Sequence, residues 1–238
     1  MKIQHLFIEA ALFVITGFLF SSCDECITGN GNIITKQVKI GDITQIRLSG
    51  DANVVLVNDS THSLTISGES NVVELYEFDQ SGNSLKIRSA RCVLHHQTIT
   101  ITIPVRIIES LTLNGSGNFS SKNKLKGADL DLDLNGSGDI NLLVEAENLE
   151  GHINGSGDIL LKGSAKNERI QVNGSGDVDN SEFAAGQVKV TINGSGNCKV
   201  LATTALDVII RGSGNVYYKG SPDVKTEVKG SGSVAKMN

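Results

Sequence analysis

The sequence predicts an all-β protein that folds as a parallel β-helix, or β-solenoid, with about 18–21 residues in each coil. Three observations predict this class. Gly-Ser-Gly recurs seven times at nearly constant spacing, apolar residues flank every copy at fixed positions, and polar and apolar residues alternate between the copies. A unit of this length cannot bury both of its strands alone, so successive units are expected to stack and share one core.

The corner of each repeat is the Gly-Ser-Gly triplet with Asn or Asp beside it. A sharp bend between two strands needs a positive φ, which glycine adopts at little cost and which Asn and Asp tolerate. Each repeat is therefore predicted as strand, glycine corner, strand and variable loop. The triplets begin at Gly115, Gly136, Gly155, Gly174, Gly194, Gly212 and Gly230. Five follow an Asn, namely Asn114, Asn135, Asn154, Asn173 and Asn193. Six precede Asn or Asp, namely Asn118, Asp139, Asp158, Asp177, Asn197 and Asn215.

Apolar residues stand two positions before and two positions after each corner. With period-two alternation these positions point to one side of a strand, so stacking aligns them into columns that form the core. The columns before the corner are Leu113, Leu134, Ile153, Val172, Ile192, Ile210 and Val228. Those after it are Phe119, Ile140, Ile159, Val178, Cys198, Val216 and Val234. Cys198 in this column is interpreted as a small buried hydrophobe.

The mature chain divides into an irregular β region over residues 32–108 and the repetitive β-helix over residues 109–238. In the first region, the segments 48–54 (LSGDANV) and 66–72 (ISGESNV) look like degenerate corners. The region is either continuous with the coils or a small β-lobe packed against their end. No linker-like stretch separates it from the repeats.

Residues 1–22 are predicted to be a signal peptide. Lys2 precedes an uncharged apolar run, Ala10 to Phe20, that is shorter than the ~20 residues of a membrane-spanning helix. The ending Leu19-Phe20-Ser21-Ser22-Cys23 resembles the lipobox of bacterial lipoproteins, although Phe20 stands where Leu is usual. The resemblance implies a lipidated Cys23, a tether over residues 23–31 and an outer-membrane, surface-exposed or periplasmic location. A retained anchor helix or a soluble secreted product are the alternatives.

The corners repeated through residues 111–235, with the opening Ile27-Thr28-Gly29-Asn30-Gly31-Asn32-Ile33, resemble the putative autotransporter adhesin, head GIN domain family of bacterial surface proteins. The resemblance covers roughly residues 29–236. It implies a β-helical fold and exposure at the cell surface, and it brings no functional residues with it.

Charge and cysteine content exclude several classes of function. The chain has 21 basic and 26 acidic residues, a net charge of −5, without a basic patch for nucleic acid. With Cys23 set aside, Cys26, Cys92 and Cys198 match neither a zinc site nor a disulfide framework. One disulfide is allowed in an oxidising compartment, but the spacing does not choose the pair.

The sharpest candidate site is the column of Asp139, Asp158 and Asp177, which hold the same place in three consecutive coils. Like charges about 4.8 Å apart repel unless they are screened, protonated or bridged by a cation such as calcium. In the simpler interpretation, each Asp bonds the backbone of its own turn and faces water. No metal ligand set and no cofactor are otherwise predicted.

The composition favours a non-catalytic binding or structural module. Its expected contacts are a membrane through the lipid anchor and a surface glycan or an envelope protein, without nucleic acid. The competing hypothesis is a polysaccharide-acting β-helix enzyme, since corner carboxylates in neighbouring coils could fall about 5–9.5 Å apart. Few tyrosines and no tryptophan are present to form a sugar platform. A spacer without any ligand is the third alternative.

Overall fold

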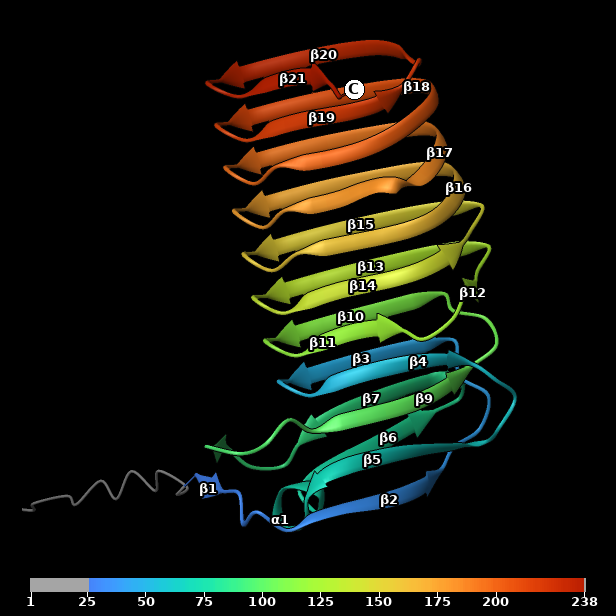
Figure 1. Cartoon of the computed structure of the whole chain (residues 1–238), viewed down its shortest axis with the longest axis vertical. Coiled ribbons are helices and arrows are strands. Elements are labelled where there is room, and N and C mark those ends of the chain that lie inside the picture. Colours follow the sequence, from blue (N-terminus) through green and yellow to red (C-terminus); the bar gives the residue numbers. More distant parts are fainter. Residues whose placement is uncertain (1–25, 238) are drawn as a thin grey trace, which may run out of the picture.

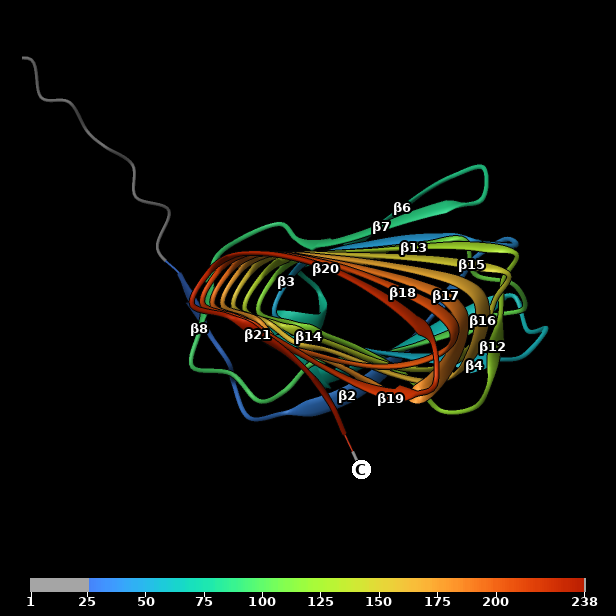
Figure 2. The same cartoon turned by 90° about the horizontal axis from the view of Figure 1, so that it is seen from above.

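Coils of β-strand lie directly above one another along the long axis of the molecule (Figure 1). The computed structural model describes residues 26–237, so the signal peptide and Cys23 lie outside the described residues. The predicted β-solenoid is confirmed, because equivalent strands of successive coils pair in parallel. Seen along the stack, each coil is a flattened loop with a corner at one end (Figure 2).

Each coil has one strand before its corner and one strand after it. The strands before the corners are β3 (Gln45–Gly50), β10 (Ser110–Gly115), β13 (Asp129–Gly136), β15 (Asn148–Gly155) and β20 (Asp223–Gly230). Those after the corners are β4 (Asn53–Asn58), β11 (Asn118–Ser121), β14 (Asp139–Glu145), β19 (Asn215–Gly220) and β21 (Ser233–Lys236), with the short β12 (Leu125–Lys126). Three strands run unbroken from one corner to the next: β16 (Ile159–Gly174), β17 (Val178–Gly194) and β18 (Cys198–Gly212).

The corners need glycine for two separate reasons. Gly136, the first glycine of its triplet, has φ +135°, and a Cβ there would lie 2.2 Å from the carbonyl oxygen of Gly115 one coil below. Gly138, the second, is not in the left-handed region, but its Cβ would lie 1.9 Å from the Gly117 carbonyl oxygen. The triplet is therefore required by backbone conformation at one position and by the close approach of the coils at both.

The core is a narrow set of aliphatic columns inside the coils. The inward-facing residues on both sides of the corners are fully buried through most of the stack, including Leu134, Ile192 and Val216. Cys198 pairs in register with Val178 and Val216 and is fully buried, so its predicted role is confirmed. Burying one such aliphatic side chain stabilises the fold by about 1.5–3 kcal/mol relative to leaving it exposed.

The first coil of the stack comes from the irregular N-terminal region. Its corner is the predicted degenerate copy: Gly50 has φ +134° and pairs in register with Gly115. Beneath this coil lie β7 (Ser84–Ser89) and β9 (Thr100–Val105), parallel to β3 and β4. The N-terminal region is thus continuous with the coils.

The second predicted degenerate corner, at residues 66–72, is wrong. Gly68 lies within β5 (Ser63–Glu69), which is antiparallel to β9 and to β2 (Ile33–Lys39) and leads into the short helix α1 (Ser70–Val73). Gly68 is needed for packing rather than for a bend, because a Cβ there would lie 2.2 Å from Cδ1 of Ile99.

Antiparallel strands and α1 form a cap on the N-terminal end of the stack (Figure 1). The chain leaves the first coil after β4, builds β5, α1, β6 (Tyr76–Ser81), β7, β8 (Val93–Leu94) and β9, and then returns in β10 on top of β3. A disulfide between Cys26 and Cys92 and the pairing of β1 (Ile27–Thr28) with β8 hold the start of the described chain against this cap.

Candidate functional site

A groove of about 870 Å³ runs along the face formed by the strands before the corners. Two rows of outward side chains border it, and the residues between them, such as Leu130 and Leu206, point into the core. One row is Asp129, Asn148, Asn167, Gln187, Ala205 and Asp223. The other is Asp131, Glu150, Arg169, Lys189, Asp207 and Lys225. Six coils contribute, so the groove is roughly 24 Å long at a strand spacing of about 4.8 Å.

Side chains of the first row hold one another in place. Asn148 donates from Nδ2 to Oδ1 of Asp129 at 2.6 Å, and Asn167 donates from Nδ2 to Oδ1 of Asn148 at 2.8 Å. Each amide thus has a fixed orientation before any ligand arrives. Ordering of these side chains costs little on binding, because it has already occurred in the free protein.

The second row changes charge along the groove. At one end, the pKa of Asp131 is raised by burial and by the nearby carboxylates of Glu150 and Asp133. In the middle, Arg169 Nε lies 3.5 Å from Glu150 Oε1. The groove therefore presents carboxylates at the N-terminal end and a mixture of cations and carboxylates further along, where Lys189 Nζ lies 3.9 Å from Asp207 Oδ2. This row was not predicted from the sequence, although each of its members stands five residues before the first glycine of a corner.

The predicted column of Asp139, Asp158 and Asp177 is present on the edge of the corners. Each carboxylate accepts a backbone N–H of the next coil: Asp158 N–H donates to Asp139 Oδ1 at 3.1 Å, and Asp177 N–H to Asp158 Oδ1 at 2.8 Å. Asn197 N–H donates to Asp177 Oδ1 at 2.7 Å. The bonded backbone belongs to the next coil and not to the residue's own turn.

These hydrogen bonds partly compensate the stacked charges without a cation. Within residues 26–237, no group of three or more His, Cys, Asp or Glu side chains is arranged to hold a metal ion. Only Oδ1 of each Asp takes part in the bonds between coils, so calcium bridging through the other oxygens stays a prediction.

A second ladder precedes the corners. Each Asn donates from Nδ2 to Oδ1 of the Asn one coil below, at 2.8–3.0 Å, through Asn114, Asn135, Asn154, Asn173 and Asn193. The sequence pattern predicts a role for these residues in turn geometry. In the stack they also link neighbouring coils, which strengthens and rigidifies the corner edge.

Inside the coils, a carboxyl group replaces one apolar side chain of the core. Glu168 lies in register between Leu149 and Val188, is 2% exposed, and accepts a hydrogen bond from Nδ2 of Asn180. Burial raises its pKa to about 8, and its Oε2 has no hydrogen-bond partner. Glu168 is therefore predominantly protonated at neutral pH, because the apolar interior disfavours its charged form.

A polar cluster joins the cap to the first corner. His96 Nε2 lies 2.8 Å from Asp51 Oδ2, and its Nδ1 lies 2.7 Å from the carbonyl oxygen of Gln97. Buried Glu69 accepts the backbone N–H groups of Gln97 and Gly31, which lower the pKa of its carboxyl. No local sequence pattern predicts this cluster, because its members come from segments far apart in the chain.

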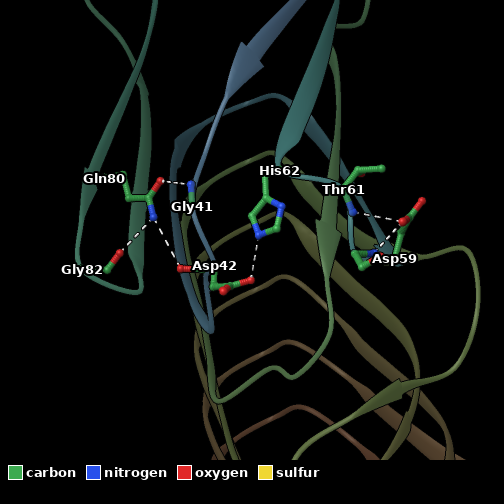
Figure 3. A network of polar contacts seen from close by, with 8 residues as sticks. Gly41, Asp42, Asp59, Thr61, His62, Gln80 and Gly82 are labelled. Carbon is green, nitrogen blue, oxygen red and sulfur yellow. Dashed lines mark hydrogen bonds and ion pairs between the residues drawn. The ribbon is translucent and has the colours of Figure 1, made fainter.

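A smaller hollow of about 190 Å³ is lined in part by the loop at Asp59 and by the loop at Asp42. Figure 3 shows the polar contacts around the loop at Asp42. Gln80 accepts the Gly41 N–H at 2.8 Å and donates to the Gly82 carbonyl oxygen at 2.9 Å, which ties the β6–β7 hairpin to this loop. His62 lies 3.2 Å from Asp42, and both side chains are largely exposed. These contacts hold loops together, and the pair is open to water.

The stacked coils and the long polar groove define the chain as a repeat-built β-solenoid. Residues 42–222 match the model of the family described as putative auto-transporter adhesin, head GIN domain. The chain belongs to this family of adhesin-like surface proteins, which confirms the resemblance in the corner sequences.

Solved structures share the fold. A putative adhesin from Bacteroides fragilis has 24% identity and a TM-score of 0.84, over 89% of this chain and all of its own. A putative adhesin from Parabacteroides merdae has 22% identity and a TM-score of 0.71, over 89% of this chain and 99% of its own. A putative lipid binding protein from Parabacteroides distasonis has 24% identity and a TM-score of 0.71, over 90% of this chain and all of its own.

No curated protein matches the sequence. Between residues 26 and 237, the structure contains no helix with the length and apolar character needed to cross a bilayer.

Proposed function

We propose that the protein is a lipid-anchored, non-catalytic binding module of the bacterial envelope and that its groove takes an extended surface glycan. The observation that carries the proposal is the continuous groove over six coils, bordered by amide, carboxylate and cationic side chains. A polyhydroxylated chain needs many donors and acceptors in a line, and the two rows supply both. An envelope protein is the other partner class that such a polar surface accommodates.

The family membership and the lipobox-like sequence support the envelope location. Cys23 precedes the first described residue by only three positions, and the disulfide from Cys26 to Cys92 fixes the neighbouring chain to the cap. A lipid on Cys23 would therefore place the cap next to the membrane. Labelling of cells with a fatty-acid analogue should mark the wild type and not Cys23→Ala, and an equally labelled variant would refute the anchor.

The groove is tested by binding of the intact protein to an array of bacterial surface glycans. Arg169→Ala should weaken binding about tenfold, since it removes a charged hydrogen-bond donor from the middle of the groove. Lys162→Ala is the matched control, because Lys162 lies on the opposite face of the coils and also pairs with a carboxylate, Glu182, at 3.0 Å. Equal loss in both variants, or no binding by the wild type, would contradict a glycan groove.

The competing function is cleavage of a polysaccharide. The observation that favours it is that two groove carboxyls, Asp131 and Glu150, lie in register on neighbouring coils. Burial and the charge of Glu150 raise the pKa of Asp131. A raised pKa is what a general acid needs. Polysaccharide hydrolysis by the wild type that is abolished in Asp131→Asn would establish the enzyme. Activity lost instead in Asp158→Asn would place it at the corners.

A further inference from the structure

The last coil leaves the apolar interior of the stack open. Val224 and Val228 on β20 continue the inward columns of Leu206 and Ile210, yet they are 38% and 41% exposed. Among the described strands, β20 pairs only with β18, so the hydrogen-bonding groups along its other edge are free. The opposite end of the stack is covered by the cap (Figure 1). A free edge over an open apolar layer is a surface that accepts another strand.

We propose that this edge binds a second copy of the chain, with β20 antiparallel to β20 of the partner and Thr226 on the two-fold axis. In this register Val224 faces the partner's Val228, which joins the two open apolar layers. The outward residues of β20 alternate in charge: Asp223, Lys225, Glu227 and Lys229. Antiparallel pairing about Thr226 sets Asp223 opposite the partner's Lys229 and Lys225 opposite the partner's Glu227. All four cross-strand pairs then join opposite charges.

The charge pattern selects this register over its neighbours. A shift of one step along the strand, centred on Lys225, would set Lys225 against its own copy and Asp223 against the partner's Glu227. A shift the other way, centred on Glu227, would set Glu227 against its own copy and Lys225 against the partner's Lys229. Intermediate registers would pair inward with outward side chains. Of these three registers, only the pairing about Thr226 is free of like-charge contacts. Pairings centred on Val224 or Val228 also avoid such contacts, but they keep only two of the four attractive pairs.

The free edge of β2 in the cap does not have a self-complementary charge pattern. Among the described strands β2 pairs only with β5, and its charged residues are Lys36 and Lys39 without an acidic residue. Antiparallel pairing of β2 with its own copy about the strand centre would set Lys36 against Lys36. Lysine on an edge strand is a known means of preventing such pairing. The two ends of the stack therefore differ, and the self-complementary end is the one formed by β20.

A two-fold contact at this end is closed, so it gives dimers and not filaments. It is also small, because only one coil of each copy takes part, and we expect weak affinity that many copies on one surface reinforce through multivalency. The inference does not depend on the proposed glycan groove, since β20 enters that groove only through Asp223 and Lys225 at its end.

Cysteine cross-linking in the full chain tests the proposal. Opposite residues of an antiparallel pair have Cα atoms about 4.5–5.5 Å apart, within reach of a disulfide. Thr226→Cys should form disulfide-linked dimers under mild oxidation. Thr204→Cys, an exposed threonine one coil earlier, is the matched control and should not. Among the described residues the only free native cysteine is buried Cys198. Because the full chain also contains Cys23, the unsubstituted protein is oxidised in parallel to measure the background.

Charge reversal then tests the register. In the Thr226→Cys background, Lys225→Glu should slow dimer formation about tenfold, because two symmetry-related attractive pairs become repulsive. Glu227→Lys should have the same effect, in addition to losing the Lys229–Glu227 ion pair of 2.6 Å within the strand. The double variant Lys225→Glu/Glu227→Lys restores opposite charges and should recover most of the rate.

Dimers from Thr226→Cys that the double variant rescues would support the proposal. Equal cross-linking of Thr226→Cys and Thr204→Cys would overturn it, and so would single reversals without effect. Capture of a different protein at this edge, with no homodimer, would also overturn it. Unchanged glycan binding in Thr226→Cys and in Glu227→Lys, whose positions lie outside the groove, would show that the groove and this contact are separate functions.

Discussion

His96 and Asp51 join the cap to the first corner of the stack, with His96 Nε2 2.8 Å from Asp51 Oδ2. The second ring nitrogen of His96 faces the carbonyl oxygen of Gln97, so both nitrogens have acceptor partners and both must donate. Both contacts therefore favour the charged form of the imidazole. Burial opposes that charge, but Gln97, Asp51 and Glu69 outweigh burial and raise the pKa of His96.

This raised pKa predicts a pH dependence of stability. Because the folded-state pKa of His96 lies above the unfolded value of about 6.5, its contribution is complete below pH 6.5. The contribution is then lost as the pH rises through the folded pKa. His96→Gln should lower the free energy of unfolding by about 1–2 kcal/mol at pH 6 and by less at pH 9. Thermal melts across this range test it, with exposed His62→Gln as the control. An equal loss at both pH values would contradict a charged His96.

Glu168 predicts a second, separate pH dependence. Its carboxyl has a pKa of about 8 in the fold against 4.5 when unfolded, so the unfolded state gives up its proton first. Stability should be greatest below pH 4.5 as far as this group is concerned and should fall as the pH rises towards 8. Glu168→Gln should remove that fall and increase stability at pH 8 by more than about 1 kcal/mol. Glu150→Gln, in the exposed row, is the control. A destabilised Glu168→Gln at pH 8 would disprove the prediction.

A comparison of two corner glycines distinguishes the cost of backbone strain from the cost of a clash between coils. Gly50 and Gly136 have nearly the same φ, +134° and +135°. A Cβ on Gly50 would meet nothing within 4 Å, whereas one on Gly136 would lie 2.2 Å from the Gly115 carbonyl oxygen. Gly136→Ala should therefore cost about 1–3 kcal/mol more than Gly50→Ala. Urea unfolding of both variants measures the difference, and equal losses would mean that the coils separate without cost.

The column of corner aspartates predicts a stabilising effect of calcium. If calcium bridges the free oxygens of Asp139, Asp158 and Asp177, millimolar calcium should raise the melting temperature and excess chelator should reverse it. Asp158→Asn keeps an acceptor oxygen for the Asp177 N–H, so its fold should survive while the calcium effect disappears. A wild-type midpoint that calcium and chelator leave unchanged would rule out the column.

The repetitive part of the fold could be predicted because the same sequence pattern recurs in every coil. A corner such as Gly155 is identified by its six equivalents, and the columns around it follow from alternation. The pattern even identified the corner at Gly50. It failed at Gly68, where a similar segment pairs antiparallel with distant strands and no local residue records that pairing.

The candidate site could be predicted only in part, because some of its contacts join segments far apart in the chain. The groove rows and the carboxyl of Glu168 could be found by writing the repeats in register, because Glu168 then interrupts an apolar column. The Cys26–Cys92 disulfide and the contact of His96 with Asp51 could not, since they depend on how the chain from 59 to 107 folds back under the first coil.

The cap and the final edge lie at opposite ends of the stack, and the coils between them take part in neither. Coils between β13 and β18 contact only neighbouring coils of the same kind. A duplication or deletion of one whole repeat there would leave the disulfide, the cap and the final edge unchanged, while the rod would change in height by about 4.8 Å. The architecture thus lets evolution adjust how far the tip reaches from its base without redesigning either end.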